Sequence, residues 1–108
     1  KVCADKGMGT ILEHENGTKF IMQTEIEDII RVHHIILFPD FSKVEEVREA
    51  FKNNCKDLDT EGRPKIRLNG EQIAEICRKA ECLLGFSHGF TPYFGLYSKF
   101  NSYKDFLL

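Results

Sequence analysis

A carboxylate and several histidines in this sequence fall where predicted strands begin or end. Glu25 follows the stretch FIMQT, His33 and His34 interrupt the apolar run RVHHIILF, and His88 comes just after CLLGF. Neutral imidazole and carboxylate groups are the ligands that suit zinc, manganese or iron. If the strands converge, the pattern predicts a metal site made of Glu25, His88 and one of the two adjacent histidines.

Each of these residues also has an ordinary structural explanation. A single histidine in a strand is more often a hydrogen-bonded structural residue than a ligand. Glu25 opens the charged run Glu25-Ile26-Glu27-Asp28, and charged runs are usually solvated. Adjacent strand residues point to opposite faces, so at most one of His33 and His34 can face a given site. Spacing alone leaves a metal site and structural histidines both open.

The strands that must position these residues are indicated by turn signals and apolar runs. Asn16-Gly17 predicts a tight hairpin that pairs residues 10–15 with residues 18–24. The apolar run from Val32 to Phe38 predicts a strand buried on both faces, and the stretch 82–86 predicts a second one.

Helices are indicated between and after these strands. Ser42 with Glu45, and Asn69 with Gln72, have the spacing of helix-capping pairs, and Ser102 is expected to start a short last helix. Buried strands that alternate with amphipathic helices indicate an α/β domain with mostly parallel strands. In such folds ligands lie beyond the carboxyl ends of the strands, which is where Glu25 and His88 are expected.

The composition is that of an ordinary globular domain. The 108 residues are 42% hydrophobic and 30% charged, with a net charge of -2, so no global basic field favours nucleic acid or membrane. One domain over residues 1–108 is expected. No apolar run is long enough to span a membrane, and no signal peptide is recognisable. We therefore expect a cytoplasmic protein whose four cysteines are free thiols.

The segment that follows His88 is rich in aromatic residues, which have two possible roles. They could stack on an unpaired nucleic-acid base, or they could close the end of the core. The chain has no glycine-rich phosphate loop, no GxSxG and no HExxH, and its basic residues are scattered. These patterns alone do not decide between the two roles.

Four stretches together resemble the proteins related to endonuclease Q. They are TEIED (24–28), RVHHIILFPDFSKVEEVREAF (31–51), EGRPKIRLNGEQIAEIC (61–77) and LLGFSHGFTPYFGLYSKFNSYKDFL (83–107). That family carries a PHP domain, the polymerase-and-histidinol-phosphatase type of metal-dependent phosphoesterase. The resemblance covers residues 18–108, and its most specific part is the block His88-Gly-Phe-Thr-Pro-Tyr93.

The resemblance implies a fold and a set of site residues. The fold would be part of a distorted, usually seven-stranded β/α barrel that holds divalent ions of zinc, manganese, magnesium or iron. Glu25, His34 and His88 would be its metal ligands and catalytic residues, with His33 as the fallback for His34. Tyr93 and Phe94 would contact a damaged base, and the substrate would be DNA.

The sequence also departs from the family in ways that bear on activity. The D-x-H-x-H motif and the Asp-x-His motif that complete the metal site do not occur here. We therefore expect an internal fragment of a longer enzyme, inactive alone, with exposed strand edges that favour oligomers. Two alternatives remain: a non-catalytic α/β module, and a phosphatase acting on a small phosphomonoester.

Overall fold

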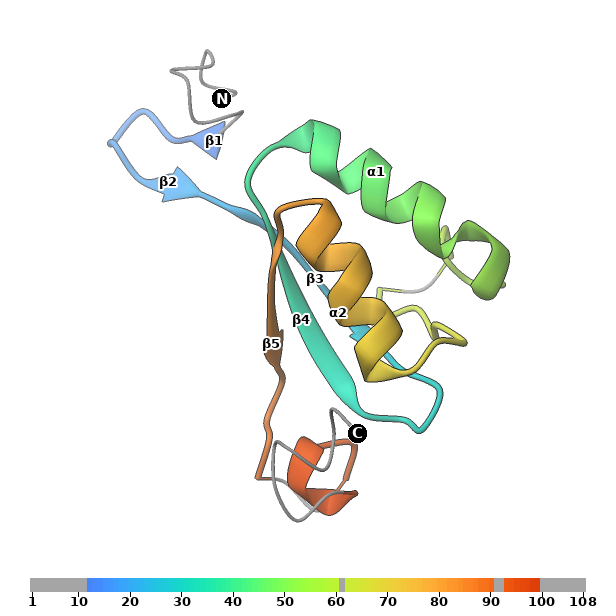
Figure 1. Ribbon diagram of the computed structural model, residues 1–108. Coiled ribbons are helices and arrows are strands. Elements are labelled where there is room, and N and C mark those ends of the chain that lie inside the picture. The colour runs from blue at the N-terminus through green and yellow to red at the C-terminus, as the bar shows by residue number, and fades with distance from the viewer. Residues whose placement is uncertain (1–11, 61, 91–92, 100–108) are drawn as a thin grey trace.

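The computed structural model describes residues 12–60, 62–90 and 93–99. An N-terminal hairpin joins β1 (Leu12–Glu13) to β2 (Lys19–Phe20) around the predicted Asn16-Gly17 turn, but the pairing is shorter than the sequence predicts, because residues 22–24 pair with a later strand. A three-stranded sheet follows, with the order β3 (Met22–Glu27), β4 (His33–Phe38) and β5 (Leu83–Phe86) (Figure 1). The elements are therefore those of a mixed α/β fold.

All three strands of this sheet pair antiparallel, so the expectation of mostly parallel strands is wrong for the part of the chain that the structure describes. Two features of the connections explain the difference. The loop between β3 and β4 spans residues 28–32, which is too short for a parallel crossover. Two helices, rather than one, separate β4 from β5, so the chain reverses its direction once more before it returns to the sheet (Figure 1).

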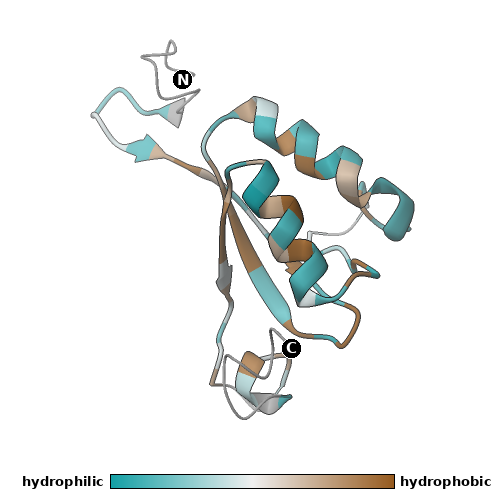
Figure 2. Cartoon of the chain, in the orientation of Figure 1, coloured by the Kyte–Doolittle hydropathy of each residue, from teal (hydrophilic) through white to brown (hydrophobic). Residues whose placement is uncertain are grey.

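Both helices cover one face of the sheet. In α1 (Phe41–Phe51), Val47 and Phe51 are buried; in α2 (Gly70–Lys79), Ile73 and Cys77 are buried. They pack with Ile26, Ile36 and Phe38 of the sheet into one hydrophobic cluster. Figure 2 shows this distribution, with β4 hydrophilic where it begins and apolar over the rest, and with hydrophilic residues alternating with apolar ones on the helices. We call the covered side the helix face and the other side the open face.

The helix starts are set by side-chain caps. The Asn69 side chain accepts a hydrogen bond from the backbone N–H of Gln72 at 2.8 Å, and the Gln72 side chain accepts one from the backbone N–H of Asn69 at 3.0 Å. This capping box confirms the predicted start of α2. The start predicted for α1 is displaced, because Asp40 rather than Ser42 provides the cap, accepting from the backbone N–H of Lys43.

The segment after β5 folds against the end of the sheet at which β4 begins. The backbone N–H of His33 donates to the carbonyl of Phe94 at 2.8 Å, and the N–H of Ser87 donates to the carbonyl of His33 at 3.1 Å. Leu96, in a short 3₁₀ turn, is buried there. Cys55, Cys77 and Cys82 are free thiols, while Cys3 and the last helix predicted from Ser102 lie outside the described residues. None of the described helices has the length and apolar character needed to cross a bilayer.

Candidate metal centre

Alternation along the strands decides which polar side chains share a face. In the register of β3 with β4, Glu25 lies opposite Ile35, and Glu27 lies opposite His33. Successive strand residues point to opposite faces, so Glu25, Glu27 and His33 all project from the open face, whereas His34 projects toward the helices. The structure therefore separates the two adjacent histidines.

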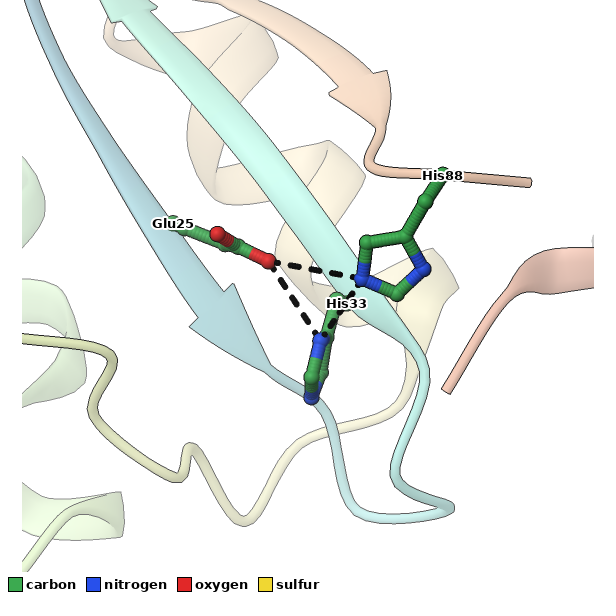
Figure 3. A group of neighbouring side chains, drawn as sticks. All are labelled: Glu25, His33 and His88. Atoms are coloured by element: carbon green, nitrogen blue, oxygen red, sulfur yellow. Dashed lines mark hydrogen bonds and ion pairs between the residues drawn. The ribbon is translucent and has the colours of Figure 1, made fainter. Parts of the chain in front are cut away.

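Glu25, His33 and His88 come together on the open face, and we call them the acid–imidazole cluster (Figure 3). His33 Nδ1 lies 3.3 Å from Glu25 Oε1 and 3.1 Å from His88 Nε2, and His88 Nε2 lies 3.7 Å from the same Glu25 oxygen. Zinc bonds of about 2.0–2.2 Å at tetrahedral angles place ligand atoms about 3.4 Å apart. The three atoms thus have the separation expected of ligands around one ion.

The bonding of these atoms fits a cation as well as their spacing does. Glu25 Oε1 is buried and accepts no hydrogen bond from the described residues. His33 Nε2 lies 3.0 Å from Glu27 Oε1, and because a carboxylate only accepts, the ring nitrogen is the donor. In the neutral ring this leaves a lone pair on Nδ1, directed toward the Glu25 oxygen and His88. A cation between these electron-rich atoms would offset their mutual repulsion, so the residues fit a divalent ion.

Glu27 contacts the site through His33 and is not itself one of the three clustered residues. A carboxylate that holds the far N–H of a metal-binding histidine fixes the tautomer and the orientation of the ring. Glu27 is 7% exposed and His33 is 2% exposed, so this contact is shielded from water. The sequence reading of residues 25–28 as a solvated charged run is therefore wrong for Glu27. Its spacing of two residues from Glu25 in a strand was the signal that could have identified it.

Three of the four non-glycine residues with positive φ in the described part of the chain lie around the cluster, and the fourth is Glu81 after α2. Arg31, His88 and Phe94 have φ angles of 72°, 37° and 59°, in the left-handed region that side chains with a Cβ rarely occupy. The Phe94 ring stacks on the His33 imidazole, with ring centroids 4.6 Å apart. The Arg31 guanidinium lies over the Phe94 ring, with Cζ 5.1 Å from the ring centroid. Strain of this kind gathers at functional sites, where the surroundings hold it in place.

His34 and Phe94 have positions that differ from the expectation. His34 is fully buried on the helix face, where its Nε2 lies 2.8 Å from Asp28 Oδ2, so it does not join Glu25 and His88. The structure brings the fallback residue His33 to the cluster instead. Phe94 supports His33 by stacking, and Tyr93 is 75% exposed beside it.

The fold and the cluster define a class: an α/β unit that presents an acid and two imidazoles in ligand geometry. Comparison with known proteins makes the relation specific. The chain is similar to the novel lesion-specific endonuclease PfuEndoQ from Pyrococcus furiosus, with a TM-score of 0.83 and 42% identity over 87% of this chain. It is also similar to endonuclease Q in complex with a 27-mer duplex substrate with an abasic lesion at the active site, with a TM-score of 0.81 and 43% identity over 85% of this chain. The resemblance to endonuclease Q predicted from the sequence is confirmed.

These matches cover only part of the relatives. The chain spans 24% and 23% of the two solved chains. An uncharacterized protein of Methanocaldococcus jannaschii is 49% identical over 74 residues, which are 68% of this chain and 9% of that protein. No family model matches the chain. The similarity therefore concerns one segment of a much longer relative.

Proposed function

We propose that this chain forms part of the metal-dependent centre of a DNA-repair endonuclease of the endonuclease Q type, which hydrolyses phosphodiester bonds. The observation that carries the proposal is the acid–imidazole cluster, in ligand geometry, within a segment 42% identical to a lesion-specific endonuclease. The alternative of a non-catalytic module accounts less well for a buried carboxylate oxygen without a hydrogen-bond donor among the described residues.

Glu25, His33 Nδ1 and His88 Nε2 would hold a divalent ion. Such an ion supplies Lewis acidity toward a phosphate oxygen and lowers the pKa of a bound water. Glu25 supplies negative charge and a second oxygen, Glu27 holds the N–H of the neutral His33 ring at Nε2 so that Nδ1 is the ligand atom, and Phe94 stacks on the His33 ring. Three protein ligands would leave such an ion accessible to water or substrate, as in catalytic zinc sites.

The substrate that the comparison supports is duplex DNA with a lesion, because that is what one solved neighbour binds. Enzymes that act at a lesion commonly extrude the nucleotide into a pocket with stacking walls. Tyr93, which is exposed and precedes the stacked Phe94 in the chain, is our candidate for contact with that nucleotide. Phe94 is already stacked on His33, so we assign it to the wall of the site rather than to an open stacking position.

We further propose that the three-stranded sheet is one sector of a β/α barrel of the PHP type. The open face carries the cluster, as the interior of a barrel would, and β5 pairs only with β4 among the described strands. Additional strands along β5 would supply the remaining ligands. In their absence, pairing of this edge between copies of the chain is the route to a homo-oligomer. A cytoplasmic location stays a prediction.

The test uses the protein at its full natural length. Elemental analysis of the purified protein should find divalent metal, and the protein should cut a duplex that contains an abasic site or a deaminated base. Glu25→Gln, His33→Ala and His88→Ala should each lower the metal content and abolish cleavage.

The control for these variants is His14→Ala, which changes an exposed histidine near the hairpin turn. Its metal content and cleavage should equal those of the wild type. Full metal content in all three cluster variants would return these residues to a structural role. Hydrolysis of small phosphomonoesters without DNA cleavage would favour the phosphatase alternative.

A further inference from the structure

A guanidinium group lies at the rim of the acid–imidazole cluster. Arg63 Nη1 is 3.8 Å from Glu25 Oε1, the oxygen that we assign to the metal, and the Arg63 side chain is 48% exposed. The carboxylate that pairs with Arg63 is thus a group that a bound cation would also contact, while about half of the Arg63 side chain remains exposed to solvent.

The backbone fixes the position of Arg63. Lys65 forms a parallel bridge with Glu27, in which the Glu27 N–H donates to the Pro64 carbonyl at 3.0 Å and the Ile66 N–H donates to the Glu27 carbonyl at 2.7 Å. Paired residues lie on the same face, so Lys65 accompanies Glu27 on the open face. Arg63, two residues earlier, falls beside Glu25.

The other described arginines that form ion pairs have partners outside the cluster. Arg48 pairs with Asp59, and Arg78 pairs with Glu75 one turn away on α2. Arg63 differs because its acid is a candidate metal ligand. When a divalent ion binds Glu25, the negative charge that holds Arg63 is shared with the ion, and the two cations repel each other across a short distance. An anion between them removes this conflict.

We propose that Arg63 is a substrate-binding residue that holds a phosphate group of the nucleic acid against the metal centre. The inference rests on the proposed function and names the group that orients its substrate. The guanidinium fork matches two phosphate oxygens and cannot be deprotonated in a protein, so it remains a donor throughout the reaction. Arg63 exchanges the carboxylate of Glu25 for the phosphate when metal and substrate are both bound.

The same segment offers cations for neighbouring phosphates. Pro64 and Ile66 are buried while Arg63, Lys65 and Arg67 are exposed, so the extended backbone presents every second residue, each of them basic, to solvent. A row of cations along an extended segment is an arrangement that can contact successive phosphates without reading bases. Arg63 is the member of this row that reaches the cluster.

The experiment compares Arg63→Gln, Arg63→Lys and Arg78→Gln in the metal-loaded protein at full natural length. Arg78 is the matched control, because it is an exposed arginine paired within α2. Titration calorimetry measures binding of inorganic phosphate, and steady-state assays measure kcat and KM on a duplex with an abasic site. Arg63→Gln should weaken phosphate binding about tenfold or more, as loss of a charge-assisted contact does. It should also raise KM or lower kcat while the metal content stays at the wild-type value.

Arg63→Lys keeps the charge but not the fork, so it should recover part of the phosphate affinity, and Arg78→Gln should resemble the wild type. Unchanged phosphate affinity in Arg63→Gln, or no phosphate binding by the wild type, overturns the inference. Loss of metal from Arg63→Gln also overturns it, since Arg63 would then act on the metal site. Phosphate binding that depends on Arg63, without any DNA cleavage, retains the role of Arg63 and overturns the endonuclease proposal.

Discussion

Both faces of the β3–β4–β5 sheet carry carboxylates and imidazoles, but the hydrogen bonding of these groups differs between the faces. On the helix face, His34 and Asp28 are fully buried and bonded to each other, and the other Asp28 oxygen accepts the backbone N–H groups of Ile30 and Val32. On the open face, the Glu25 oxygen crowds two imidazoles and accepts no hydrogen bond within the described chain. The bonds of Asp28 to His34 and to the backbone indicate a structural role for this pair, whereas convergent electron-rich atoms indicate a site for a ligand.

Among the variants considered for the two faces, removal of the Asp28–His34 pair should have the largest effect on folding stability. Asp28→Ala leaves His34, the buried N–H of Val32 and the partly buried N–H of Ile30 without their acceptor, so the free energy of unfolding should fall by about 3–5 kcal/mol. Urea denaturation measures the change. Asp59→Ala, which removes an exposed carboxylate, is the control and should lower it by less than about 1 kcal/mol. Equal values for the two variants would show that the helix face does not depend on this pair.

Neighbouring isoleucines in β4 test the faces with a single side-chain type. Ile36 is 0% exposed in the hydrophobic cluster, and Ile35 faces the open side. Ile36→Ala should reduce the free energy of unfolding by about 2–5 kcal/mol, the usual range for truncation of a buried isoleucine. Ile35→Ala, measured in the same urea titration, should lose clearly less. A larger loss at Ile35 would contradict the assignment of the faces.

Glu27 tests the role assigned to the open face, because it lies on that face and yet is as buried as a core residue. Removing a carboxylate that orients a ligand histidine typically lowers metal affinity about 10–100-fold, and we expect this loss for Glu27→Ala. Glu27→Gln keeps an acceptor for His33 and should recover part of the affinity. Competition with a chromophoric chelator measures it, with Glu49→Gln on the outside of α1 as the control. A metal affinity unchanged in Glu27→Ala would restrict Glu27 to packing.

The smallest expected effect concerns the thiols on the helix face. Burial raises the pKa of Cys77 to about 12, so the thiolate that reacts with alkylating agents is nearly absent at pH 8. Iodoacetamide at that pH should leave Cys77 unmodified in the folded chain and modify it after unfolding in urea, as read by mass spectrometry. Stability linked to this thiol is complete below pH 9 and declines as the pH rises toward 12. Rapid modification of Cys77 in the folded chain would show that α2 opens readily.

Local signals in the sequence predict most elements of this fold, and pairing between elements is what they miss. The Asn16-Gly17 turn and the Asn69–Gln72 capping box depend on neighbouring residues only, and both are where the sequence predicts them. Strand direction depends on the number of helices between strands. The two predicted helices between residues 38 and 82 imply that the chain reverses direction, a detail that the general association of α/β alternation with parallel sheets does not capture.

The site could be predicted only in part, because its assembly also depends on pairing between strands that are distant in the sequence. Glu25 and His88 meet although the parallel argument was wrong, because an antiparallel β4 brings its amino end to the carboxyl ends of β3 and β5. The choice of His34 over His33 rested on resemblance, since β4 is apolar on both faces and its period-two pattern assigns no direction. Arg63 could not be found from local sequence, because it reaches Glu25 through pairing over 38 positions.

One consequence follows from the composition of β4. Its residues HHIILF would look almost unchanged if the strand slid by one position, with imidazole replacing imidazole and aliphatic replacing aliphatic. The strand therefore carries little information about its own alignment, and the tether from Asp28 to Val32 must supply it. Shortening or lengthening that five-residue connection would place one imidazole in the position of the other and turn His33 toward the helix face, while a far-ultraviolet spectrum would hardly change.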